Sequence, residues 1–260
     1  MVAVPLSTQL DMQKTVDTNR QLEQIKEAIY GFAMANGRLP CPATANSAGS
    51  ESFCTTDLPG ACGLEIVTYN ITNNGRCFNS SGFVPAATLA LAPVDAGGFA
   101  VDAWGFTQNR VRYALSPIRF PFGPAPPTPP ACTAPSPASL GNNILSQTSS
   151  MQAVTMTCLA DMNTAMNLLS VVSTTVSNPP GCIPTTLTAK APFVIFSLGK
   201  NAATGGTGAD EAQNISAGAT TFVSHIPTQA GNCAGEFDDL VTWGSLNTLF
   251  ARMVQAGKLP

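Results

Sequence analysis

Apolar residues recur at helical spacing over residues 7–36, and no proline interrupts this stretch. Ser7 or Thr8 can cap the start of a helix here, because a side-chain oxygen at that position accepts a hydrogen bond from a main-chain N–H of the first turn. Gly37 stands where a glycine in the left-handed conformation ends many helices. The pattern predicts one helix over residues 7–36, with a length of ~45 Å at 1.5 Å per residue.

The two halves of this predicted helix differ in their apolar content. In the second half, apolar side chains follow one another at spacings of three and four: Leu22, Ile25, Ile29 and Phe32. This spacing is typical of a helix face that packs on a core. The first half has too few apolar residues for such a face: Leu10, Met12 and Val16. We predict that residues 7–20 project into solvent and that the environment changes at about Gln21.

Apolar and β-branched runs along the rest of the chain predict several strands. They lie around Tyr113, after a turn at Trp104-Gly105, and at 168–176, 192–197, 220–226 and 237–243. A helix is expected over 150–167, and a short last helix is capped by Ser245 and closed by Gly257. These elements predict a chain that contains both helices and strands.

Two segments show neither the helical nor the strand periodicity of apolar residues. Residues 38–82 contain four cysteines and several glycines, which favours a loop region held by disulfides. Residues 117–137 contain nine prolines, which exclude a helix or a central strand and favour a stiff polyproline II connection.

Composition narrows the class of protein. The 260 residues carry a net charge of −3 with only 10% charged residues, so nothing indicates binding to nucleic acid or to an anionic membrane. No apolar run reaches the ~20 residues of a transmembrane helix, and the first ten residues lack the features of a signal peptide.

The eight cysteines are widely spaced, and the chain has a single histidine. Zinc sites favour closely spaced pairs, so the spacing instead favours disulfides formed in an oxidising compartment. The alternative is a set of buried free thiols in a cytosolic protein. We predict that all eight are paired, with Cys41, Cys54, Cys62 and Cys77 forming one group and Cys132, Cys158, Cys182 and Cys233 the other.

No catalytic constellation emerges from the motifs. The glycine-rich stretch 197–211 fails both phosphate-binding templates, and G-x-S-x-G is absent from the sequence. No serine or cysteine is marked out as a partner for His225. Asp238 and Asp239 are neighbours in the predicted strand 237–243, so we expect their side chains to point to opposite faces. We predict that the protein is not an enzyme.

Three stretches resemble the type IV pilin-like proteins, the pilins and pseudopilins of bacterial pili and type II secretion. "GFAMANGRLPCPA" (31–43) is similar to the end of the pilin spine helix, and "DAWGFTQNRVRYALS" (102–116) to a pseudopilin stretch. The third is "APFVIFSLGKNAATGGTGADE" (191–211) with "EFDDLVTW" (236–243). The resemblance implies an α+β fold in which the long N-terminal helix packs on an antiparallel sheet. It places a spine helix over residues 1–36 and a globular head over 37–260, with an insertion at 117–190.

A family precursor begins with a short leader and an apolar segment, and here the chain begins where that segment would end. The resemblance implies an exported, disulfide-bonded subunit, and the large insertion favours a minor or tip subunit over a major one. Its partners would be other pilin or pseudopilin subunits, bound through the N-terminal helix. Before assembly the subunit would be anchored in the inner membrane by the missing apolar segment. The filament would be periplasmic or on the cell surface. The alternative is a secreted adhesin or carbohydrate-binding module that uses the insertion.

The stretch 197–211, "SLGKNAATGGTGADE", resembles the calcium loop of pseudopilins. Calcium takes six to eight oxygen ligands, including main-chain carbonyls that glycines can turn inward. By this resemblance Asn201 and Asp210 would supply side-chain ligands, and Glu211 would assist. Asn201 stands in place of a carboxylate, and Lys200 adds a positive charge beside the site. The alternative is a glycine-rich turn held by its own hydrogen bonds.

Overall fold

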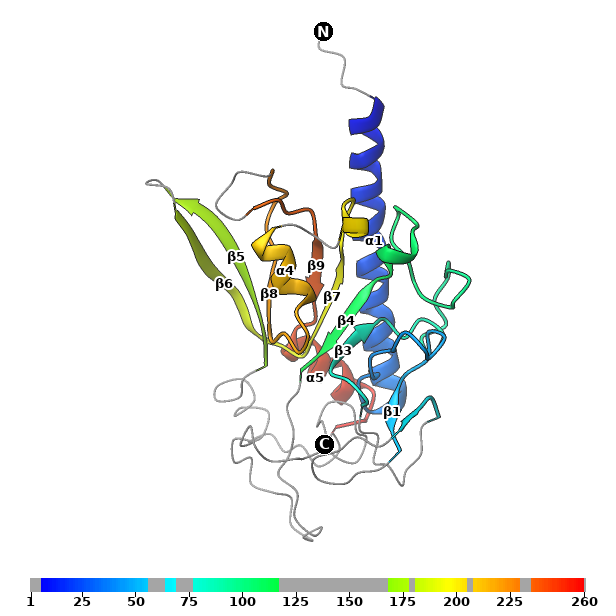
Figure 1. Ribbon diagram of the computed structural model, residues 1–260. Coiled ribbons are helices and arrows are strands. Elements are labelled where there is room, and N and C mark those ends of the chain that lie inside the picture. Colours follow the sequence, from blue (N-terminus) through cyan, green and yellow to red (C-terminus); the bar gives the residue numbers. More distant parts are fainter. Residues whose placement is uncertain are drawn as a thin grey trace.

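The computed structural model describes residues 6–55, 64–68, 77–116, 168–177, 181–204, 208–229 and 235–259. Within these residues the fold is α+β, with a long N-terminal helix and largely antiparallel sheets (Figure 1). The proline-rich segment 117–137 and the helix predicted over 150–167 lie outside the described residues. No helix of the described part is both long enough and apolar enough to cross a membrane.

Helix α1 (Leu6–Asn36) confirms the predicted long helix. Gly37 ends it with a positive φ of 71°, and its N–H donates to the Ala33 carbonyl. Leu22, Ile25 and Ile29 are buried as predicted. The prediction for Phe32 is wrong, because its ring is only partly buried and lies under the Arg38 guanidinium, 5.0 Å from the ring centroid.

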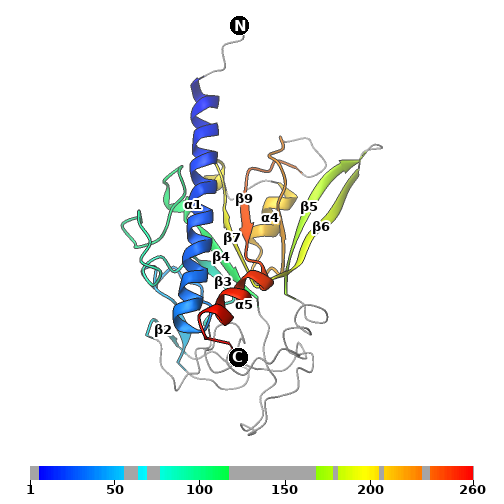
Figure 2. The same ribbon diagram turned by 180° about the vertical axis from the view of Figure 1, so that it is seen from behind.

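The first half of α1 extends beyond the rest of the described fold (Figures 1 and 2). Its apolar side chains are exposed: Leu6, Leu10, Met12 and Val16. The predicted exposure of residues 7–20 is wrong for Thr18, which is fully buried and accepts a hydrogen bond from the Ala103 N–H. Asp11, Lys14, Thr15 and Asp17 are partly buried. A second bond joins the Gln21 amide to the Val101 carbonyl at 2.7 Å. These contacts fix the helix to the loop before β4.

The central layer is a four-stranded antiparallel sheet in the order β3-β4-β7-β9. Its strands are β3 (Ser81–Phe83), β4 (Arg112–Leu115), β7 (Phe193–Ser197) and β9 (Leu240–Trp243). Side chains alternate between the two faces of a sheet. Tyr113, Phe193 and Ile195 accordingly enter one core with α1, whereas Val194 and Phe196 enter a second core on the opposite face.

Helix α5 (Leu246–Gln255) packs beside α1 on the first face (Figure 2). As predicted, the Ser245 side chain caps it by accepting from the Thr248 N–H, and Gly257 follows it with a positive φ. Tyr30 joins the two helices to the sheet. Its hydroxyl accepts a 2.7 Å hydrogen bond from the Ser245 N–H, and its ring meets Phe193 edge-on.

The second face of the sheet is covered by helix α4 (Ala209–Ile215) and by elements of a three-stranded sheet, β6-β5-β8. The strands are β5 (Leu169–Ser177), β6 (Gly181–Ala191) and β8 (Thr221–Val223), and β5 pairs with β8 in parallel. The predicted strands at 168–176, 192–197 and 220–226 are confirmed. Strand β6 was not predicted, because "GCIPTTLTAKA" has little apolar alternation and contains a proline.

The cysteine-containing region holds two short strands, β1 (Phe53–Cys54) and β2 (Glu65–Ile66), and a disulfide between Cys41 and Cys77. Cys54 and Cys182 are also disulfide-bonded, so every cysteine among the described residues is oxidised. The Cys41–Cys77 bond lies within the first predicted group. The other four cysteines lie outside the described residues.

A buried ion pair fixes the chain just after α1. Arg38 donates two hydrogen bonds to the Glu51 carboxylate, at 2.6 and 3.0 Å, and both side chains are more than 90% buried. Glu51 also accepts from the Cys41 N–H at 2.7 Å. The guanidinium lies between the rings of Phe32 and Phe53. This arrangement places "GRLPC" beside the disulfide.

We predict that the two halves of α1 contribute unequally to stability. Ile29→Ala should lower the free energy of unfolding by about 2–5 kcal/mol, because it leaves a cavity at a fully buried site. Val16→Ala should leave it almost unchanged, because Val16 is 58% exposed. Urea unfolding followed by circular dichroism measures both. Equal losses would mean that the whole helix is packed.

We also predict that the Arg38–Glu51 pair is sensitive to the loss of one partner. Glu51→Gln should lower the free energy of unfolding by about 3–5 kcal/mol, because it leaves a buried cation without its counter-charge. The matched control is the double variant Arg38→Met with Glu51→Leu, which removes both charges and should recover most of the loss in the same urea titration. A double variant as unstable as the single one would contradict this explanation.

Candidate functional site

Asp102 organises the loops near the exposed half of α1. Its buried carboxylate accepts hydrogen bonds from the Ser197 hydroxyl and the Asn109 amide, and its main-chain carbonyl accepts from the Gly105 N–H. Gly105 has a φ of 78°, which explains the turn predicted at Trp104-Gly105. Burial raises the pKa of Asp102. This residue therefore joins the "DAWG" turn to the end of β7.

The glycine-rich stretch begins at this junction. The Gly199 carbonyl accepts from the Asn109 amide at 2.6 Å, and Gly199 has a φ of 64°. A Cβ atom at Gly199 would lie only 2.4 Å from the Asp238 carbonyl, and one at Gly208 would collide with the Glu236 carbonyl. The two segments thus pack main chain against main chain, and glycine is required at both positions.

The acidic end of the stretch is the first turn of α4, which the sequence analysis did not predict. The Glu211 carboxylate accepts a hydrogen bond from the Gly208 N–H at 3.3 Å, as in the second half of a capping box. It also accepts from the Asn201 amide and from the Asp238 N–H, each within 3.1 Å. Glu211 is 1% exposed, so these donors offset much of the cost of its burial.

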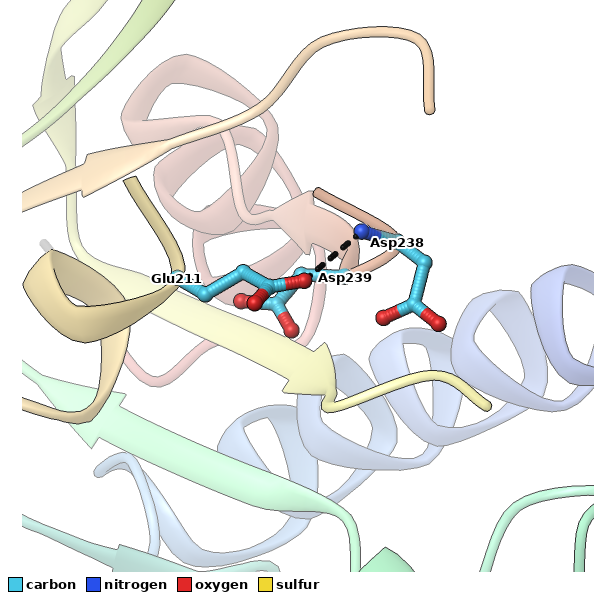
Figure 3. Close-up of side chains that lie close together, drawn as sticks. All are labelled: Glu211, Asp238 and Asp239. Carbon is cyan, nitrogen blue, oxygen red and sulfur yellow. Dashed lines mark hydrogen bonds between the residues drawn. The ribbon is translucent and has the colours of Figure 1, made fainter. Parts of the chain in front are cut away.

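Two further carboxylates meet Glu211 (Figure 3). One oxygen each from Glu211, Asp238 and Asp239 lie within 4.8 Å of one another. Figure 3 shows the Glu211 and Asp239 carboxylates against each other, with that of Asp238 to one side. We call these three residues the acidic trio. They come from α4 and from the segment before β9.

The predicted position of Asp238 and Asp239 is wrong, and so is the expectation that their carboxylates cannot converge. Strand β9 begins at Leu240, so both residues precede it and the alternation of a strand does not apply to them. The Asp238 carboxylate accepts from the main-chain N–H groups of Lys200 and Asn201, whereas that of Asp239 accepts from the Asn214 amide at 2.7 Å.

Burial dominates the electrostatics of the acidic trio. Burial in the first place, and then the nearby charges of Glu211 and Asp238, raise the pKa of Asp239 to about 8. Burial also raises the pKa of Asp238 to about 6, again with a contribution from Glu211. Three ionised carboxylates this close and this buried repel one another. Either a proton or a cation relieves that repulsion.

The structure separates the three residues named as calcium ligands by the sequence analysis. Asn201 and Glu211 lie together, joined by the hydrogen bond at the trio. Asp210 instead contacts His225, whose Nε2 lies 3.0 Å from the Asp210 carboxylate. The His225 ring stacks on Phe237 with centroids 3.9 Å apart. The Lys200 ammonium extends to Asp11 of α1, at 2.6 Å, rather than into the trio.

No family model, curated protein or solved structure matches the chain.

The acidic trio fits a hard cation in two respects. Calcium binds oxygens at 2.3–2.6 Å, so two of its ligands lie at most ~5 Å apart, which accommodates the 4.8 Å spacing. Asp238 Oδ1 is also buried and accepts no hydrogen bond from the residues the structure describes. Glu211, by contrast, already receives several protein donors. Asn201 presents its amide nitrogen to Glu211, so it would act as a ligand only after rotation of the amide.

We predict that calcium raises the thermal midpoint at pH 8.5, where protons compete least for Asp239. With a dissociation constant of ~10⁻⁴ M and ~1 mM calcium, linkage adds about 1.4 kcal/mol. Scanning calorimetry with calcium and with chelator measures the shift. Asp238→Asn should remove it, because the amide oxygen can keep the hydrogen bonds from Lys200 and Asn201 while the charge is lost.

Asp210→Asn is the matched control, because Asp210 lies at His225 rather than in the trio. If Asp210→Asn removes the calcium shift and Asp238→Asn does not, calcium binds at Asn201, Asp210 and Glu211, as the resemblance implies, rather than at the acidic trio. If calcium leaves the wild-type midpoint unchanged, the stretch is a turn held by its own hydrogen bonds.

Proposed function

We propose that the protein is a filament subunit of the type IV pilin-like class, in either a type IV pilus or a type II secretion pseudopilus. It acts by assembly and not as an enzyme. The observation that carries this proposal is the division of α1 into a packed half and an exposed half. The resemblance of residues 31–43, 102–116 and 191–211 to that family supports it.

Apolar side chains on an exposed helix gain free energy when another surface covers them. Val16 is 58% exposed and Leu10 is 50% exposed, although each is an aliphatic residue on a regular helix. Pairing with other subunits through this half of α1 would bury these side chains. The proposal therefore assigns the packed half to the stability of the head and the exposed half to assembly.

The direction of the exposed half is fixed by contacts to the head, which suits a helix that must align with neighbours. Lys200 pairs with Asp11 at 2.6 Å, and Thr18 accepts from the Ala103 N–H. The Lys200–Asp11 pair is largely exposed and contributes little by itself. Thr18 is buried, so its contact to the loop provides the firmer constraint.

The oxidised cysteines support the exported part of the proposal. Disulfides persist in the periplasm and outside the cell, and every described cysteine is disulfide-bonded. We propose a periplasmic or cell-surface filament, anchored in the inner membrane before assembly. Calcium at the acidic trio would then serve to hold the segment before β9 against α4, a structural role.

We predict that Val16→Asp abolishes incorporation into filaments in the organism that encodes the chain, while the melting midpoint of the isolated domain stays within about 2 °C of wild type. The cost of placing a charge there arises only when a neighbour covers the helix. The matched control is Val254→Asp on α5, where the side chain is 47% exposed. It should leave incorporation intact. Sheared filament fractions probed with an antibody measure both variants.

Normal incorporation of Val16→Asp would contradict assembly through this half of α1. Loss of incorporation for both variants would indicate a general defect and contradict the assignment. Release of the full-length protein as a monomer that binds glycans would favour the adhesin alternative.

A further inference from the structure

Two arginines two residues apart have opposite surroundings. Arg110 donates to the Asp95 carboxylate at 2.6 Å and lies over the Phe99 ring, 4.1 Å from its centroid. Arg112 lies 4.5 Å from the centroid of the Phe83 ring. Among the described residues, Arg112 has no acidic partner, and its Nε is buried without a hydrogen-bond acceptor. Asp95 therefore neutralises the charge of Arg110, whereas no described carboxylate neutralises that of Arg112.

The register of the central sheet places Arg112 on its second face. It lies directly opposite Phe83 of β3 and Phe196 of β7, so these three side chains share one side of the sheet. This is the face that carries the second core, with Phe196 and Phe222. A guanidinium among aromatic side chains loses hydration, and burial accordingly lowers the pKa of Arg112. The neighbouring Arg110 charge lowers it further.

A cavity of about 110 Å³ opens beside Arg112, between the central sheet and α4. Residues of β3 and β4 line one side, and Asn214, Ser216 and Phe222 line the other. The volume is several times the ~10–15 Å³ that one water requires and well below the ~300 Å³ of sites for drug-sized ligands. The cavity therefore admits a small group rather than a sugar ring or a nucleotide.

The lining selects the charge and shape of that group. The guanidinium fork matches the two oxygens of a carboxylate. Ser81 and Ser216 add hydroxyl groups to the lining, and Phe196 and Phe222 add apolar surface. Among the residues that the structure describes, Arg112 is the only charged side chain that lines the cavity, and Asn214 already bonds to Asp239. A single positive charge in the lining favours a monoanion over a dianion such as phosphate.

We propose that this cavity is a binding site for a carboxylate group, which pairs with Arg112. The carboxylate belongs either to a small free organic acid or to an aspartate or glutamate side chain of a partner protein. Both sources offer the same two oxygens. The lining includes no member of the acidic trio and no residue of the exposed half of α1, so the site can be tested separately from the proposed filament role.

The test follows the Nε–Hε resonance of Arg112 by ¹H–¹⁵N correlation spectroscopy on the intact chain. Sodium acetate, added at constant ionic strength against sodium chloride, should move this resonance downfield in a saturable manner. The Nε–Hε resonance of Arg110 is the internal control, and it should stay in place because Asp95 already accepts from it. No saturable shift at Arg112, or an equal shift with chloride, would overturn the proposal.

A second pair of titrations separates the two sources. N-acetyl-aspartate N-methylamide carries the aspartate side chain between blocked peptide groups. Binding at least as tight as acetate supports a partner side chain, whereas binding of acetate alone supports a free acid. Sodium sulfate tests the charge, and a tighter site for sulfate than for either carboxylate would overturn the choice of a monoanion.

Variants give an independent readout by thermal melting. Arg112→Gln should leave the midpoint in chloride unchanged or raised and should abolish the increase caused by acetate. Arg110→Gln should lower the midpoint, because it breaks the pair with Asp95, but should retain the acetate increase. If Arg112→Gln retains that increase, the proposal fails. The spectroscopic test on the wild-type protein does not depend on the folding of either variant.

Discussion

The packing of the second half of α1 against the central sheet determines the rest of the architecture. Ile25, Ile29 and Ala33 enter the same core as Tyr113 and Phe193, and all five are buried. Burial of large apolar side chains is the main favourable term in folding. Because α1 and α5 occupy one face of this sheet, α4 and β8 must cover the other (Figures 1 and 2).

Buried polar contacts fix the positions of the loops, which apolar packing alone does not determine. Asp102, Asn214 and Glu211 are buried, and each bonds to groups from distant parts of the chain. Buried polar groups require partners, so such residues restrict the loops to few arrangements. Asp102 fixes the end of β7, and Asn214 joins α4 to β8 and to Asp239. These hydrogen bonds hold α4 and the segment before β9 in place, and the acidic trio forms where the two segments meet.

Much of the fold follows from local pattern. The long helix, the glycine that ends it and the Ser245 cap depend on neighbours in sequence, and each was predicted. Strand β6 was missed because its threonines alternate with few apolar residues. The acidic trio depends on the meeting of residues 27 positions apart, which no local period encodes. The isolation of Arg112 has no sequence signal either, because Arg110 has the same residue type and yet receives a partner from Asp95.

Strand β6 also has a consequence for the behaviour of the protein at high concentration. It forms one border of its sheet within the described residues, and eleven residues make it the longest strand there. A long border with exposed Ile183 and Leu187 invites strand-to-strand aggregation. Pro184 removes one main-chain donor from that border, and Lys190 places a charge near its end. A proline and a charged residue in such a border oppose strand pairing between copies of the protein, and so oppose amyloid-like stacking.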